Sequence, residues 1–161
     1  MNTDIVFSFI HDSPHMKLLL AAILGALVGL EREIAGKDPS LRTFSLICLG
    51  SCLFSLISVE AAMQAKGQFS DPGRVAAQVV TGIGFLGAGA IFRSKGGVSG
   101  LTTAALMWLT AALGMAVGFG QGELAAFGTF VAVAVVYSLK LIHRAIRKWR
   151  PHMYAEQQDY D

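Results

Sequence analysis

The sequence predicts an all-α integral membrane protein, a bundle of five transmembrane helices packed through small residues. Of its 161 residues, 53% are hydrophobic and only 15% are charged, and the mean hydropathy is +0.55. A soluble domain carries roughly 25% charged residues. Long uncharged segments also separate the charged residues. Because a spanning helix needs about 20 mostly apolar residues, these segments are candidate spans.

The first predicted span begins at Pro14. Its uncharged segment, 18–30, has only 13 residues, but Ser13 followed by Pro14 is typical of a helix N-cap and first helical residue. A helix from Pro14 to about Ile34 would be about 30 Å long. Its last turn would then lie at the membrane surface.

The other four predicted spans follow from uncharged segments. Residues 43–59 contain 17 uncharged positions, and residues 75–92 contain 18. The segment 96–122 contains 27, and the segment 124–139 contains 16. The last of these is short, but Lys140 can extend its amine to the interface.

Five spans place the two termini on opposite sides of the membrane. With the N-terminus outside, ten Lys and Arg residues lie on the inner side and three on the outer side. The positive-inside rule therefore favours a membrane protein with its N-terminus outside and its C-terminus in the cytoplasm. The predicted parts are an N-terminal extramembrane segment (1–13), a five-span domain (14–142) and a short basic, then polar, cytoplasmic tail (143–161).

The motif G-x-G-x-x-G occurs at residues 82–87. A dinucleotide-binding loop would need a preceding strand and an acidic residue about 20 positions later. Here the motif lies in an uncharged segment and "LTTAALMW" follows, which argues against a nucleotide site. If residues 82–89 form a helix, their glycines leave two of its faces without side chains, so that two neighbouring helices can approach its backbone. We therefore expect this helix at the centre of the bundle. Alternatively, the glycines could unwind this helix and expose carbonyl groups to an ion.

Similar small-residue pairs recur in the other predicted spans. They let helix backbones approach closely, and their number also favours a homodimer. The glycines expected to serve helix packing are Gly25, Gly29, Gly82, Gly84, Gly87, Gly89, Gly114 and Gly118.

Charged residues gather at the inner ends of the predicted spans. Charges near the hydrocarbon boundary are costly unless they pair or face water. We therefore predict an inner-side ionic cluster. Its arginines would bridge two helical hairpins, one formed by the first and second spans and the other by the third and fourth. The alternative is that these residues only set topology and reach the interface. The cluster comprises Glu31, Arg32, Glu33, Arg42 and Arg93.

This cluster is a weak candidate for a Mg²⁺ site, because nearby basic residues offset its carboxylates. Mg²⁺ favours one or two carboxylates plus several waters. A phosphate or a lipid headgroup suits the arginines better. The predicted helix start near Ser99, Thr102 and Thr103 would also offer free backbone N–H groups to an anion.

Neither a cofactor nor a nucleic-acid partner is expected from the residues. The span centres hold mainly Ser, Thr, Cys and Gly, and all four His residues flank the predicted membrane segments. A proton-coupled pathway usually needs ionisable groups at mid-membrane. The residues therefore give no support to an enzyme.

Four segments resemble the MgtC/SapB family of bacterial inner-membrane proteins. They are "GALVGLERE" (25–33), "LRT" (41–43), "RVAAQVVTGIGFLGAGAIF" (74–92) and "GLTTAALMWLTAALGMAVGFG" (100–120). The resemblance covers roughly residues 17–142. It implies a multi-span membrane domain associated with growth at low Mg²⁺ and with survival inside host cells.

The resemblance also implies a function. It favours a non-enzymatic regulator, linked to Mg²⁺ limitation or acid stress, that acts through membrane partners such as the F-type ATP synthase. The alternative is a transporter or channel for Mg²⁺ or another small ion. The acidic and arginine motif positions of the family would fall on the ionic cluster. Longer members carry a soluble C-terminal domain, whereas about 20 residues follow the predicted fifth span here.

Overall fold

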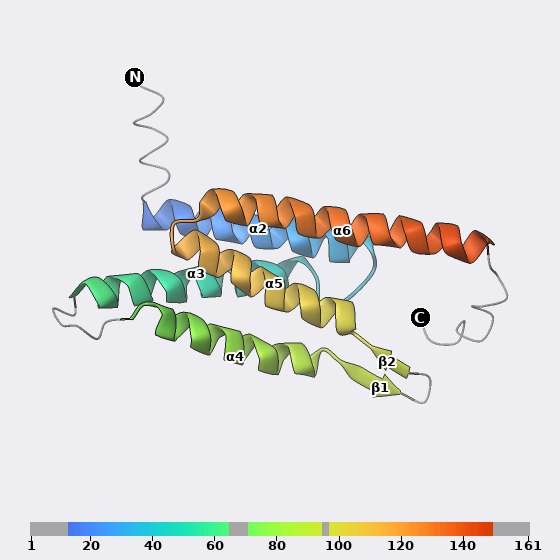
Figure 1. Ribbon diagram of the computed structural model, residues 1–161, viewed down its shortest axis with the longest axis horizontal. Coiled ribbons are helices and arrows are strands. Elements are labelled where there is room, and N and C mark those ends of the chain that lie inside the picture. Colours follow the sequence, from blue (N-terminus) through green and yellow to red (C-terminus); the bar gives the residue numbers. More distant parts are fainter. Residues whose placement is uncertain (1–12, 65–70, 95–96, 150–161) are drawn as a thin grey trace, which may run out of the picture.

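The computed structural model describes residues 13–64, 71–94 and 97–149. Over these residues the chain forms five helices and one two-stranded hairpin (Figure 1). The elements are α2 (Pro14–Ile34), α3 (Leu41–Gln64), α4 (Gly73–Gly89), β1 (Phe92–Ser94), β2 (Gly97–Ser99), α5 (Leu101–Gly118) and α6 (Gly122–Trp149). Successive helices run in opposite directions, so α2 starts and α6 ends at opposite ends of the bundle (Figure 1). The predicted all-α bundle of five helices is confirmed.

Four of the helices in the described residues are long and apolar enough to cross a membrane. They are α2, α3, α5 and the first part of α6, Gly122–Ile142. Helix α4 has 17 residues, which matches the lower limit of about 17 for a spanning helix. The segments 1–12 and 150–161, which include most of the predicted N-terminal segment and much of the predicted tail, lie outside the described residues.

Local sequence signals explain where α2 begins and ends. Ser13 is the N-cap and Pro14 the first helical residue, as predicted, because proline has no N–H to leave unpaired at this position. At the other end, Gly36 adopts a positive φ of 65°. The N–H groups of Gly36 and Lys37 then donate to the carbonyls of Glu33 and Arg32. This double hydrogen bond is a Schellman motif, which ends a helix by satisfying its last carbonyls.

Helix α5, and not α4, lies at the centre of the bundle. It packs against α2, α3, α4 and α6, whereas α4 contacts mainly α5 and α3. Only Ile83 and Gly87 of α4 are buried. The expected central position of the glycine-rich helix is therefore wrong. Gly87 meets Ala104 of α5, but Gly82, Gly84 and Gly89 have nothing within 4 Å of an added Cβ.

The closest helix contacts form around α3, at glycines of α2 and α5. A Cβ added to Gly25 of α2 would lie 2.5 Å from the Phe44 carbonyl oxygen and 2.7 Å from Cys48 Cβ. A Cβ added to Gly114 of α5 would clash with the backbone of Cys48. Close backbone approach of this kind is how small residues stabilise helix pairs in membranes. Gly29 meets Leu41, and Gly118 meets Cys52 and Ser55, in the same way.

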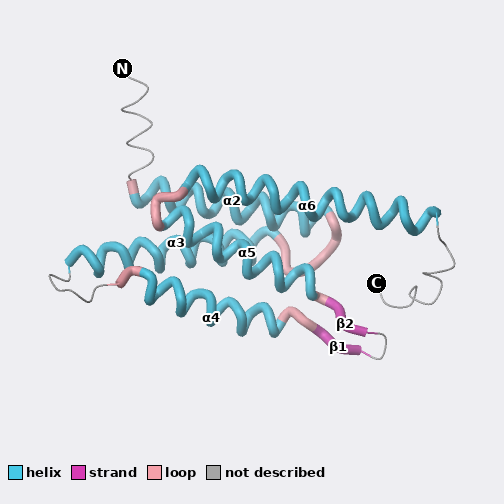
Figure 2. The backbone as a smooth tube through the Cα atoms, in the orientation of Figure 1, coloured by secondary structure: helices cyan, strands magenta, loops and turns pink. Residues whose placement is uncertain are grey.

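A short β-hairpin connects α4 to α5, a feature that the sequence did not lead us to expect (Figure 2). Phe92 pairs with Ser99, Arg93 with Val98 and Ser94 with Gly97, in antiparallel register. Gly100 follows with a positive φ of 86°, and an added Cβ there would clash with the Ala90 carbonyl oxygen. The hairpin and the α2–α3 connection, residues 35–40, lie at the same end of the bundle (Figure 1). We call this the loop end.

Candidate functional site

One ion pair lies at the loop end, between neighbouring residues of α2. The Arg32 Nε donates to Glu31 Oε2 at 2.5 Å, and the same carboxylate oxygen pairs with a terminal guanidinium nitrogen. Arg32 is only 6% exposed, because it continues the buried stripe that includes Val28 and Gly29. Glu31 therefore neutralises a charge that packing has removed from water.

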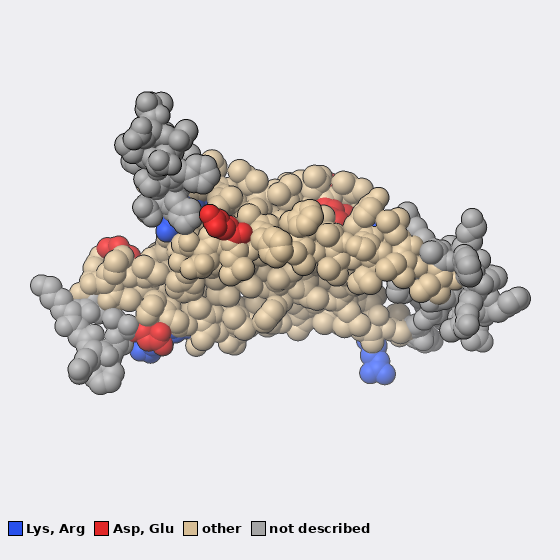
Figure 3. Space-filling model, turned by 45° about the horizontal axis from the view of Figure 1, so that its top comes forward, with Lys and Arg blue, Asp and Glu red and all other residues tan. Residues whose placement is uncertain are grey.

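The other residues of the predicted ionic cluster remain apart. Glu33, Arg42 and Arg93 are all exposed. Within the described residues, the Arg32–Glu31 pair is the only ion pair. The arginines consequently form no ion pair between the two helical hairpins there. Figure 3 shows charged side chains towards the two ends of the face in view.

The predicted anion contacts at the start of α5 do not converge on one site either. The Ser99 hydroxyl donates to the Phe92 carbonyl at 3.5 Å, within the hairpin. Thr102 is exposed and Thr103 is buried. Gly100 caps the helix without a side-chain hydrogen bond.

A pocket of about 550 Å³ opens at the loop end between α3, α4 and α5. This volume is in the range of small-molecule sites, about 300–1,000 Å³. The polar part of its lining comes from the α2–α3 connection and the start of α3: Asp38, Ser40, Arg42 and Thr43. The apolar part includes Leu86 and Ala90 of the α4 end, Phe92 of β1 and Met107 of α5.

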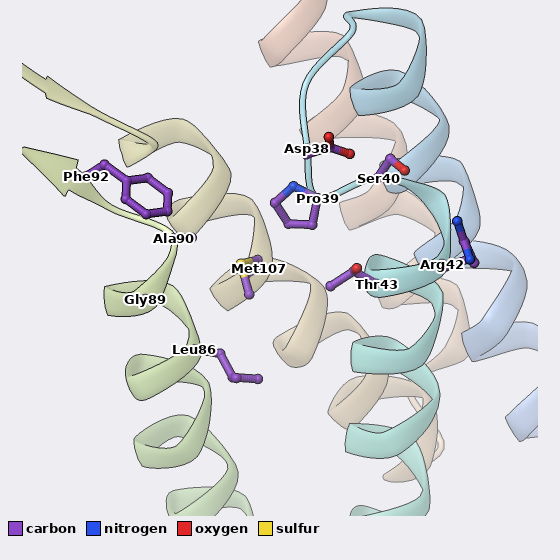
Figure 4. Close-up of a pocket in the computed structure, with 10 residues that line it drawn as sticks. All are labelled: Asp38, Pro39, Ser40, Arg42, Thr43, Leu86, Gly89, Ala90, Phe92 and Met107. Carbon is purple, nitrogen blue, oxygen red and sulfur yellow. The ribbon is translucent and has the colours of Figure 1, made fainter.

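The close-up of the pocket shows how these side chains are arranged (Figure 4). Thr43 points from α3 towards Met107, and Leu86 points from α4 into the space between the helices. Asp38 lies at the outer end of the pocket, while Arg42 lies at its edge, on the side of α3 away from α4. The lining thus changes from charged at the loop end to apolar deeper between the helices.

The sequence alone does not predict this pocket. Arg42 is one of the predicted site residues, whereas Ser40, Thr43 and Met107 are not. Their positions in the sequence carry no shared spacing, because four separate elements supply the lining. Only the common loop end of the two hairpins brings them together.

Several buried hydroxyl groups of the bundle donate to a carbonyl four residues earlier in the same helix. Ser55 donates to the Ser51 carbonyl at 2.9 Å, and Thr110 donates to the Leu106 carbonyl at 2.7 Å. Thr129 of α6 does the same with Ala125 at 2.9 Å. Over the described residues, no group of three or more His, Cys, Asp or Glu side chains could hold a metal ion.

The chain is a multi-pass α-helical membrane protein. Four of its described helices are long and apolar enough to cross a membrane, and charged side chains lie towards the two ends of the bundle. The family model for the MgtC family matches residues 18–145. The chain therefore belongs to the MgtC family, and the resemblance noted in its sequence is confirmed.

Individual relatives support the same assignment. The candidate magnesium transporter YhiD of Escherichia coli K12 is 44% identical over 124 residues, which cover 75% of this chain and 58% of that protein. Protein SapB of Bacillus subtilis is 36% identical over 146 residues, covering 88% and 62%. Protein MgtC of Salmonella typhimurium LT2 is 42% identical over 116 residues, covering 72% and 48%. The chain thus spans about half to two thirds of the length of these relatives, and no solved structure matches it.

Proposed function

We propose that this chain is a non-enzymatic regulator in the bacterial inner membrane that acts by packing against other membrane proteins. The proposed context is adaptation to Mg²⁺ limitation or acid stress, as the family resemblance implies. No cofactor is needed for such a role. The proposed orientation places the N-terminus outside and the C-terminus in the cytoplasm, so that the loop end faces the cytoplasm.

The observation that carries this proposal is the outward face of α4. Phe85 is 81% exposed, and it shares a helix face with Gly82 and Gly89, which have open space around them. Glycines in a membrane helix favour close approach of a second helix. Inside the bundle, the glycines of α2 and α5 are already in contact with α3. The free glycine face of α4 therefore suits a partner helix from another chain.

Two partners fit this face. A second copy of the chain would give the homodimer that the surplus of small residues favours. A different membrane protein would give a regulatory complex, and the F-type ATP synthase is the partner that the family resemblance suggests. Both depend on helix packing along the same surface of α4.

Site-specific cross-linking in cells at low Mg²⁺ tests the proposal. A photoreactive phenylalanine analogue at Phe85 should form cross-links to protein. The same analogue at Phe130 of α6, which is 70% exposed, is the matched control and should label mainly lipid. A product of twice the chain mass would identify the homodimer, and a larger product would identify a separate partner. Equal protein cross-linking from both positions, or none from Phe85, would contradict the proposal.

The alternative function is transport of Mg²⁺ or another small ion. It is supported by the name of the Escherichia coli relative, a candidate magnesium transporter. Against it stands the close backbone packing of α2 and α5 on α3 at the centre of the bundle. A conducting path would have to run elsewhere, or these helices would have to separate.

A further inference from the structure

We propose that the last turns of α6 bind the headgroups of anionic phospholipids at the membrane surface. The segment concerned is residues 140–149, which we call the basic end of α6. This role goes beyond the proposed regulatory function and does not depend on a partner for α4. Three features of the helix point to it: its length, an exposed apolar stripe and the placement of its charges.

Helix α6 is longer than the hydrocarbon core of a membrane. Its 28 residues make it about 42 Å long, whereas the core is about 30 Å thick and the headgroup layer adds roughly 5–8 Å on each side. The part that is apolar enough to span ends at Ile142. The turns after it therefore lie at the depth of the headgroups. Figure 1 shows that α6 continues past the ends of α2 and α5 at the loop end, so its last turns extend beyond both helices.

An apolar stripe continues along α6 into the basic end. Residues three or four positions apart lie on the same face of a helix, and the members of this stripe are all exposed: Val135, Leu139, Ile142 and Ile146. Ile146 lies beyond the spanning part, so the stripe does not stop where the span stops. Burial of such side chains among acyl chains is favourable. The basic end is therefore stabilised when it stays in contact with the membrane.

Basic residues occupy the other side of the same segment. The sequence places Lys140, Arg144 and Arg147 four and three residues apart, which puts these positions within about 60° of one another on the helix. This face is roughly opposite the apolar stripe. Lys148 adds a fourth basic residue, and residues 124–155 contain no Asp or Glu. The charge of the basic end is therefore not offset by carboxylates of its own segment.

The combination of the two faces favours a lipid surface over other anions. A helix with an apolar side and a side rich in Lys and Arg is typical of an interfacial helix, and basic clusters beside a span attract anionic lipids. An acidic protein or a free phosphate would use the charges but leave the apolar stripe exposed. Residues that only set topology need no fixed side of the helix, because the positive-inside bias depends on their number.

The test uses Trp149, at the end of the segment, as a reporter. The chain has two tryptophans, so Trp108→Phe leaves Trp149 as the only one. The purified full chain is placed in bilayers of equal parts phosphatidylglycerol and phosphatidylcholine, with quenching bromine atoms near the headgroup end of the acyl chains of one lipid or the other. We expect brominated phosphatidylglycerol to quench about twofold more, because clustered basic residues enrich anionic lipid around them. High salt should reduce the difference, since it screens surface charges.

Variants of the reporter chain separate the basic end from other inner charges. Replacing Arg144, Arg147 and Lys148 together by Gln should make quenching by the two lipids equal, while Lys at 144 and 147 should keep the preference. The control is Lys37→Gln with Arg93→Gln, which removes two exposed charges at the loop end outside α6 and should change nothing. Circular dichroism checks that each variant keeps its helices. Both leaflets have the same composition, so the direction of insertion does not affect the result.

Three outcomes would overturn the proposal. The first is equal quenching by the two brominated lipids in the reporter chain, and the second is an unchanged preference in the triple Gln variant. The third is weak quenching by both lipids that grows when the protein is diluted in lipid, which would mean that a second copy of the chain covers the basic end.

Discussion

At the scale of single residues, two kinds of position hold the bundle together. Glycines such as Gly25 and Gly114 let α2 and α5 contact the backbone of α3. The Glu31 carboxylate compensates the buried charge of Arg32 at the end of α2. Both arrangements leave little room for substitution, so each makes a prediction about stability.

Gly114→Ala should destabilise the protein strongly. The new Cβ would lie closer than 3.0 Å to the backbone of Cys48, and overpacking of this kind typically costs about 1–3 kcal/mol. Gly50→Ala is the matched control, because nothing lies within 4 Å of a Cβ at Gly50. Unfolding titrations in mixed detergent would measure both variants. Equal stability of the two would contradict the backbone contact between α5 and α3.

Glu31→Gln should cost more stability than Glu33→Gln. The first substitution leaves the Arg32 charge buried without its carboxylate, which costs about 3 kcal/mol when a pair is well buried. Glu33 is exposed and forms no ion pair in the described residues, so its loss should change stability by about 0.5 kcal/mol or less. The same unfolding titration compares the two. A larger effect at Glu33 would place the important carboxylate elsewhere.

At the scale of elements, the sequence predicted helix ends better than helix neighbours. Ser13 and Pro14 located the start of α2, because capping depends on local backbone groups. The glycines of 82–89 predict a helix at the centre of the bundle, yet α4 lies at its edge. A glycine shows that a neighbour can approach, but not whether that neighbour is in the same chain. The short β-hairpin and the pocket could not be predicted either, since three-residue strands and a four-element lining leave no periodic pattern.

Helix α4 makes a separate prediction, because its 17 residues are near the limit for a span. If α4 crosses the membrane, cysteines placed at its two ends should react with impermeant reagents from opposite sides. Suitable positions are Asp71→Cys before the helix and Ser94→Cys after it, both exposed. Lys37→Cys is the control for the loop end and should match Ser94→Cys. Native Cys48 and Cys52 are buried and would be replaced by Ala. Labelling of Asp71→Cys and Ser94→Cys from one side would mean that α4 does not span.

At the scale of the whole molecule, the bundle combines a closed centre with open surfaces. Helices α2, α3 and α5 are packed through glycine contacts, while α4 turns glycines and Phe85 outwards. The loop end adds a pocket lined by residues of both helical hairpins. This distribution suits a protein whose partner, a membrane helix, binds at its outer surface. It suits a transporter less well, because the centre offers backbone contacts where a path would be needed.

Mg²⁺ flux into liposomes that contain only the purified, folded protein distinguishes a regulator from a transporter. For a regulator we expect no uptake above that of protein-free liposomes, both for the natural chain and for Glu33→Gln. Uptake that rises with the amount of protein and is lost in Glu33→Gln would contradict the regulatory proposal. It would make the chain a transporter and place the loop end on the ion's route.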